Sequence, residues 1–183
     1  MVDVSESESE CAEPAGALQP DVVPGLYWGV RDSFVQYVLG NPDGGMHGDD
    51  GLETDGEGMF RFPVLTADHA GSTWRMSFAG DLRFTAHLGM LNVGLIRPVV
   101  ELGVGVGTLS IEGPDGTRVT ILELDAAEPV TIDDEWLVFP PIATRLTEHG
   151  VAVFGDVYPA GTSFDDVRIA LPAGEATPVG AAG

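Results

Sequence analysis

The chain has 183 residues, enough for one domain with a hydrophobic core, and it carries 29 acidic against 8 basic residues, a net charge of −21. A surface of this kind repels phosphate backbones and anionic lipid heads, so we expect no nucleic-acid partner. With Cys11 as its one cysteine, the chain can form neither an intramolecular disulfide nor a cysteine-rich metal site. No segment is long and apolar enough to span a membrane.

Composition divides the chain into three parts. Residues 1–20 are acidic and poor in bulky apolar side chains, which predicts a disordered tail. The same residues lack the basic start and apolar run of a signal peptide. Residues 22–171 are predicted to form a single domain, and 172–183 a flexible tail.

A helix is predicted at the start of the domain. The glycine, asparagine and proline at 40–42 are a stop signal for it. Ser33 and Tyr37 are four residues apart, so they share one face of this helix. Apolar residues recur before the stop signal with helical spacing, at Tyr27, Val30, Phe34, Tyr37 and Val38.

The segment 41–58 is rich in glycine and acidic residues. Calcium binding is one interpretation, but no stretch matches the spacing of an EF-hand loop. We therefore predict an acidic surface loop.

From Gly58 onward the pattern is typical of β-structure. Short runs rich in valine, isoleucine, phenylalanine and threonine alternate with turn residues, as in a sandwich or barrel. We predict a mainly β fold, an antiparallel β-sandwich-like domain with one or two short helices, and expect Trp28, Trp74 and Trp136 in its core. The runs are 59–65, 73–80, 82–88, 90–102, 106–113, 117–124, 136–142, 151–158 and 164–171.

Sequence signatures of enzymes are missing. There is no G-x-S-x-G, Walker or H-E-x-x-H motif. The glycine-rich tract 103–113 continues into a strand pattern and not a helix, so it fails as a dinucleotide site. Of the four histidines, His87 alone follows a strand pattern, and alternation places it opposite Leu82 and Phe84, near the end of the strand. We expect a binding protein and not an enzyme.

Three blocks, in order, resemble the HtaA-type haem-transport domain of corynebacteria and related actinobacteria. W-G-V-R-D-S-F-V-Q-Y-V, residues 28–38, is similar to the opening helix of that domain. G-D-L-R-F-T-A-H-L-G-M-L, residues 80–91, is similar to its strand and histidine segment. F-G-D-V-Y-P-A-G-T-S-F-D-D-V, residues 154–167, is similar to its closing segment.

The resemblance implies a haem slot flanked by the helix, with ferric haem b bound for uptake and transfer. It implies that Tyr37 ligates the iron as a phenolate, that His87 hydrogen-bonds this phenolate, and that Ser33 and Tyr158 contact the haem. Phenolate oxygen is a hard ligand that suits ferric iron, and tyrosine is an established haem ligand. An arginine near the slot could balance the haem propionates, but neither Arg83 nor Arg97 is assigned this role.

The resemblance also implies a secreted or cell-surface protein that exchanges haem with other transfer proteins of the cell envelope. Two alternatives stay open. The domain could have lost haem and act in protein contacts or in the structure of the cell envelope. It could instead be a hydrolase or a lectin-like sugar binder, which its carboxylates and tryptophans permit, although nothing in the sequence places them together.

Overall fold

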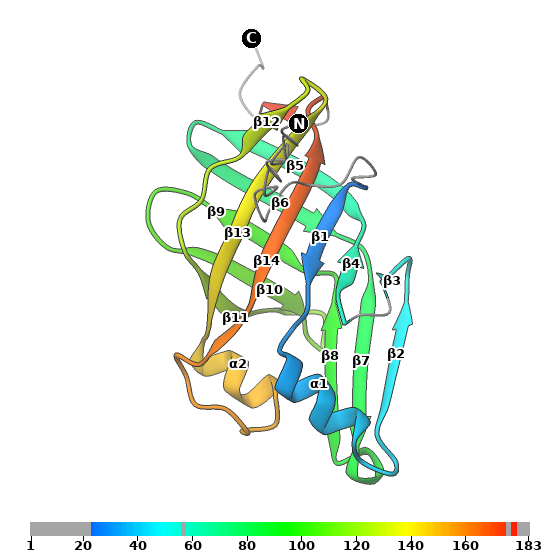
Figure 1. Ribbon diagram of the computed structural model, residues 1–183. Helices are drawn as coiled ribbons and strands as arrows, with labels where there is room; N and C mark the ends of the chain where they lie inside the picture. The colour runs from blue at the N-terminus through cyan, green and yellow to red at the C-terminus, as the bar shows by residue number, and fades with distance from the viewer. Residues whose placement is uncertain (1–22, 56–57, 175–176, 179–183) are drawn as a thin grey trace, which may run out of the picture.

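The chain folds into two open, mainly antiparallel β-sheets with two short α-helices at one end of the molecule (Figure 1). The computed structural model describes residues 23–55, 58–174 and 177–178, and these counts refer to that part of the chain. The prediction of a mainly antiparallel β fold with one or two short helices is confirmed. The predicted tail 1–20 lies outside the described residues, as does most of the predicted tail 172–183.

The larger sheet has twelve strands in the described residues, in the order β15-β5-β6-β9-β10-β11-β13-β14-β1-β4-β3, with β12 added to β13. All its pairs are antiparallel except β15 with β5. The strands are β1 (Gly25–Trp28), β3 (Glu53–Thr54), β4 (Phe60–Phe62), β5 (Val64–Ala70), β6 (Thr73–Phe78), β9 (Val99–Leu102), β10 (Gly107–Glu112), β11 (Arg118–Leu124), β12 (Val130–Ile132), β13 (Trp136–Leu146), β14 (Ser163–Pro172) and β15 (Thr177–Pro178).

The smaller sheet has three strands in the order β2-β7-β8: β2 (Gly45–Asp49), β7 (Asp81–Ala86) and β8 (Leu91–Ile96). A 3-10 turn, η1 (His87–Gly89), joins β7 to β8. Helix α1 (Asp32–Leu39) follows β1, and helix α2 (Glu148–Val153) precedes β14. Neither helix is long and apolar enough to cross a membrane.

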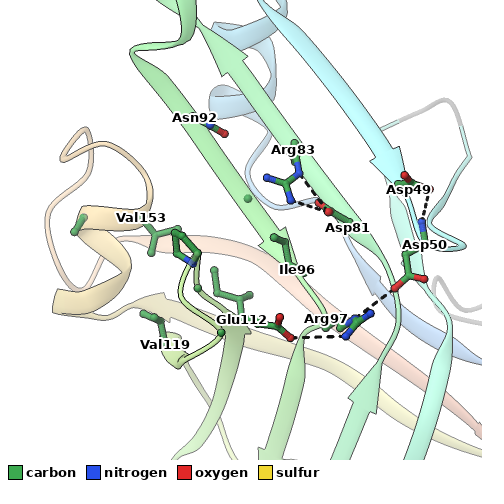
Figure 2. A pocket seen from close by; sticks show the side chains of 16 residues that line it. Asp49, Asp50, Asp81, Arg83, Asn92, Ile96, Arg97, Glu112, Val119 and Val153 are labelled. Atoms are coloured by element: carbon green, nitrogen blue, oxygen red, sulfur yellow. Dashed lines mark hydrogen bonds and ion pairs between the residues drawn. The ribbon is translucent and has the colours of Figure 1, made fainter.

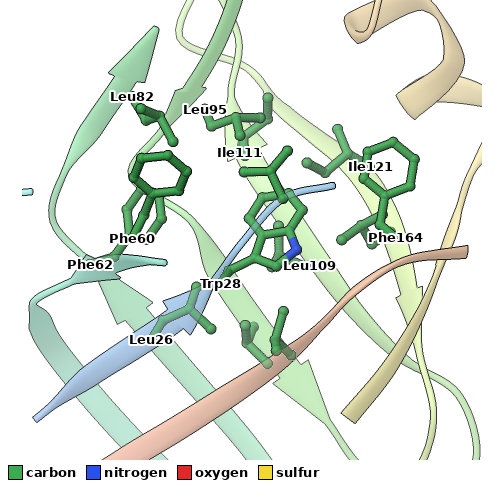
Figure 3. Packing of buried hydrophobic residues seen from close by; sticks show 14 of the residues in the cluster. Leu26, Trp28, Phe60, Phe62, Leu82, Leu95, Leu109, Ile111, Ile121 and Phe164 are labelled. Atoms are coloured by element: carbon green, nitrogen blue, oxygen red, sulfur yellow. The ribbon is translucent and has the colours of Figure 1, made fainter. Parts of the chain in front are cut away.

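Both sheets contribute side chains to one hydrophobic core. Leu82 and Leu95 enter it from the smaller sheet, and Trp28, Phe60 and Ile111 from the larger one (Figure 3). Buried and exposed residues alternate along β7 and β8, so each strand of the smaller sheet presents one face to the core. Of the three tryptophans, those at 28 and 74 are buried, as predicted, whereas the one at 136 is only half-buried at the start of β13.

The predicted helix begins later than its apolar pattern indicated. Residues 25–28 form β1, which pairs with β14 on one side and β4 on the other. The side chains of Leu26 and Trp28 are buried on it, and this two-residue alternation is strand-like. Val30 then adopts a left-handed conformation, with φ 66°, and turns the chain into α1.

Two further segments differ from the prediction. The acidic segment 41–58 contains β2 and β3, and β2 pairs with β7 along its whole length. The apolar run 151–158 is not a strand. Its first residues end α2, which starts because the Thr147 side chain accepts a hydrogen bond from the Gly150 N–H at 3.0 Å.

Candidate functional site

Helix α1 is fixed by its buried side. Phe34 is fully buried and packs edge-on against Phe84 of β7, with ring centroids 5.2 Å apart, and against Phe154 after α2, at 5.3 Å. A helix of eight residues is too short to be stable alone, so these contacts determine its position. Ser33 and Tyr37 therefore lie on one fixed surface of α1.

Tyr37 and His87 form a hydrogen-bonded pair. The Tyr37 Oη lies 2.5 Å from the His87 Nε2, although the residues are 50 positions apart in the chain. Tyr37 is 45% exposed, so its hydroxyl remains open to a ligand. The pair thus joins the C-terminal half of α1 to the end of β7, as the resemblance implied.

An unusual turn brings His87 to Tyr37. Strand β7 ends at Ala86, and both His87 and Leu88 have left-handed backbones, with φ of 54° and 57°. Such conformations are costly for residues other than glycine. Strand alternation predicted that His87 would lie on the face of Arg83, opposite Phe84. The turn instead directs its imidazole to α1, which packs on the Phe84 side.

Asp43 supports this turn. Its carboxylate accepts a hydrogen bond from the Leu88 backbone N–H. That hydrogen bond holds the pKa of the Asp43 carboxyl below its ordinary value. Asp43 follows the end of α1, so the helix and the turn that carry the pair are linked by a second contact.

Ser33 and Tyr158 also meet. The Ser33 Oγ and the Tyr158 Oη are 3.4 Å apart, and either can donate. Tyr158 lies in the connection between α2 and β14, where its ring packs edge-on against Phe164 at 5.6 Å. The four predicted residues therefore form two pairs, both on the same surface of α1.

Arg31 belongs to this group, although the sequence did not single it out. Its Nε–H donates to the Ser33 Oγ at 3.0 Å, and its guanidinium lies 5.1 Å from the centre of the Tyr158 ring. It stands inside the first conserved-looking block of the resemblance only as one letter, and its partner Tyr158 is remote in sequence, so no local pattern could identify it.

Arg83 and Arg97 lie elsewhere. They line a groove of about 770 Å³ between the smaller sheet and the β10–β11 turn (Figure 2). Arg83 pairs with Asp81 at 2.9 Å, and Arg97 lies between Asp50, at 3.5 Å, and Glu112, at 4.0 Å. Neither Tyr37 nor His87 lines this groove. Their surface is open, and the exposed side chains of the neighbouring turn include Leu88 and Met90.

The donor set at this surface suits one kind of metal group. Within the described ranges, no three His, Cys, Asp or Glu side chains gather to hold a metal ion. Tyr37 thus offers a single oxygen ligand, too few for a bare ion. Iron in a porphyrin already has four nitrogen ligands, so one phenolate supported by one imidazole fits it.

Fold and site together define a mainly antiparallel β-domain with a tyrosine–histidine pair presented at one end. The family model described as Htaa matches residues 25–170, most of the chain, and the chain therefore belongs to the HtaA family. No curated protein matches the sequence.

Solved structures share the fold. The C-terminal domain of HtaA from Corynebacterium glutamicum is 21% identical, with a TM-score of 0.66 over 81% of this chain and 94% of that one. The N-terminal domain of the same protein is 21% identical, with a TM-score of 0.65 over 81% and 95%. The haem-binding protein HtaB from the same organism is 23% identical, with a TM-score of 0.62 over 80% and 91%.

Proposed function

We propose that this protein binds ferric haem b, with the phenolate of Tyr37 as the iron ligand and His87 as its hydrogen-bond donor. The observation that carries this proposal is the 2.5 Å contact between the Tyr37 Oη and the His87 Nε2 on an exposed surface. A tyrosine at a helix surface has no need of such a partner, because water can satisfy its hydroxyl.

His87 acts on Tyr37 and not on the iron. With its proton on Nε2, the imidazole donates to the phenolate oxygen and favours the charged form of Tyr37. The left-handed turn and the Asp43 carboxylate hold this ring in place. Bound haem supplies a ferric iron whose open axial position takes the phenolate oxygen. Hydrogen bonds of this type to a metal ligand tune its strength as a donor.

Ser33 and Tyr158 complete the proposed contact surface. Both hydroxyls are on the same side of α1 as Tyr37, and they lie 3.4 Å from each other. The exposed Leu88 and Met90 provide apolar surface beside His87. A flat, largely apolar macrocycle with polar substituents at one edge suits a surface of this composition.

A role in haem uptake and transfer follows from the ligand. An anionic oxygen favours ferric over ferrous iron, so it suits capture and release better than oxygen storage or electron transfer. HtaA-family proteins are haem-binding transport proteins and not enzymes, and we assign no catalytic step to this chain. As partners we propose other haem-transfer proteins of the cell envelope, with the protein itself secreted or at the cell surface.

Titration with ferric haem, followed by absorption, tests the proposal on wild type, Tyr37→Phe and Tyr27→Phe. Tyr27 is the matched control, because its hydroxyl donates to the Val23 carbonyl on β1 and takes no part in the site. We expect wild type and Tyr27→Phe to saturate with the spectrum of a tyrosinate complex, and Tyr37→Phe to lose that spectrum. If wild type binds no more haem than an unrelated acidic protein, the proposal is wrong, and the haem-free protein-contact alternative gains support.

A further inference from the structure

Arg31, just before α1, is a cation without a carboxylate partner in a strongly acidic chain. Among the described residues no carboxylate lies within the 4.0 Å of an ion pair from it. Five of the other seven arginines do form such pairs, which are listed with their partners' strands as Arg61, Arg75, Arg83, Arg97 and Arg145. In a protein of net charge −21, an unpaired arginine at the candidate site calls for a physical explanation.

The guanidinium of Arg31 is nevertheless held in place. Its Nε–H donates to the Ser33 Oγ at 3.0 Å, and its Nη1–H donates to the Ser163 carbonyl. Its centre lies 5.1 Å from the ring of Tyr158 and 5.8 Å from the ring of Phe164. A guanidinium has five N–H donors, so three of them have no hydrogen-bond partner in the described part of the chain.

The carboxylate of Asp165 does not neutralise this charge. Burial, followed by the neighbouring Asp32, raises the pKa of Asp165 above its ordinary value, and the charge of Arg31 only partly offsets this. The two side chains therefore interact through space without an ion pair. The free donors of Arg31 remain available to a ligand from outside the chain.

The distance from Tyr37 fits a ligand that spans both residues. Arg31 precedes Tyr37 by six residues, about 9 Å at the rise of an α-helix. Ser33, which Arg31 contacts directly, shares its helix face with Tyr37. The same reach separates the centre of a porphyrin from the ends of its propionates.

We propose that Arg31 binds a propionate carboxylate of the haem and so determines which edge of the macrocycle lies at the N-terminal end of α1. This inference rests on the proposed haem binding. A guanidinium and a carboxylate form two parallel hydrogen bonds, which fix orientation as well as adding affinity. The hydroxyls of Ser33 and Tyr158 border the same position. Arg31 also offsets locally the repulsion between an acidic protein and a ligand with two carboxylates.

The test compares iron(III) protoporphyrin IX with its dimethyl ester, which keeps the iron and the ring but lacks both carboxylates. Dissociation constants are measured by absorption for wild type, Arg31→Gln and Arg168→Gln, in one solvent mixture. Arg168 on β14 is the matched control, since it is exposed and has no ion pair in the described residues. It lies five residues from Ser163 along the strand, roughly 17 Å away. Thermal unfolding of each ligand-free variant shows whether the fold is kept.

The informative quantity is the ratio of the two dissociation constants for each protein. We expect Arg31→Gln to reduce the preference for the free acid about tenfold, as loss of one charge-assisted contact predicts, with the tyrosinate spectrum retained. Arg168→Gln is expected to change the ratio by less than about twofold. If Arg31→Gln weakens the acid and the ester equally, or weakens neither, Arg31 does not bind a propionate. Failure of wild type to bind either ligand would refute haem binding itself, a result distinct from these.

Discussion

Replacing Phe34 by alanine is expected to damage the fold and the site together. Phe34 has no exposed surface and packs against Phe84 and Phe154 at 5.2 and 5.3 Å. Removing such a ring leaves a cavity and costs about 3–5 kcal/mol of the free energy of unfolding. For a domain of this size the melting temperature then falls by roughly 6–20 °C.

The effect on haem binding follows from the shortness of α1. Without its main buried anchor, the helix no longer holds Tyr37 at hydrogen-bonding distance from His87. We expect haem affinity to fall at least about tenfold, as for other losses of support around a metal ligand. Differential scanning calorimetry of the ligand-free protein gives the first quantity, and absorption titration with ferric haem gives the second.

Phe78→Ala is the matched control, because Phe78 is equally buried but lies on β6 of the larger sheet. It is expected to lower the melting temperature by a similar amount while haem affinity stays close to that of wild type. Phe34→Leu keeps most of the volume and should lose less in both measurements. If both alanine variants lose haem affinity equally, or if Phe34→Ala keeps it, the specific link between this anchor and the site is refuted.

Three further predictions concern the charged and polar groups of the site. His87→Ala should still bind ferric haem through Tyr37 but about 10–100-fold more weakly, with a shifted tyrosinate band; unchanged affinity would remove His87 from the site. Because the pKa of Asp43 is depressed in the fold, its contribution is present above the ordinary carboxyl pKa and is lost as pH falls through the lower, folded value. Asp43→Ala should therefore weaken haem binding at neutral pH, whereas Asp115→Ala, which removes a carboxyl of similarly lowered pKa from the β10–β11 turn, should not. The pKa of Asp165 is raised, mainly by burial, so its ionisation destabilises the fold as pH rises past the ordinary carboxyl pKa; Asp165→Asn should raise the melting temperature at neutral pH, and a lowered one would contradict this.

The sequence allowed much of the fold to be predicted, because strand alternation is a local signal. The buried and exposed positions of β6, β7, β8 and β10 follow the two-residue period of their sequences. The apolar run 151–158 was misassigned as a strand because a short apolar run has no period that separates a strand from a helix. Its helical start depends on the cap at Thr147, and its end packs through Phe154 against α1.

The site was predictable only where its signal is local. The four-residue spacing of Ser33 and Tyr37 is visible in the sequence, and so is the end of the strand before His87. The left-handed backbones of His87 and Leu88 were not, because neither residue is a glycine and the support from Asp43 comes from 45 positions away. Arg31 was missed for the same reason, since Tyr158 and Ser163 approach it only in the folded chain.

The uninterrupted apolar run 90–102 serves two sheets. Its first part is β8 of the smaller sheet, and its second is β9 of the larger one, with Arg97 in a left-handed conformation between them. The smaller sheet also receives the chain from α1, so His87 moves with that sheet, while Tyr37 moves with the segment that leaves β1. A slight rotation of the smaller sheet at this joint would lengthen the contact between tyrosine and histidine while every hydrogen bond of the larger sheet stays intact. The domain can therefore loosen its hold on a ligand by a rigid displacement, at far less cost in free energy than local unfolding.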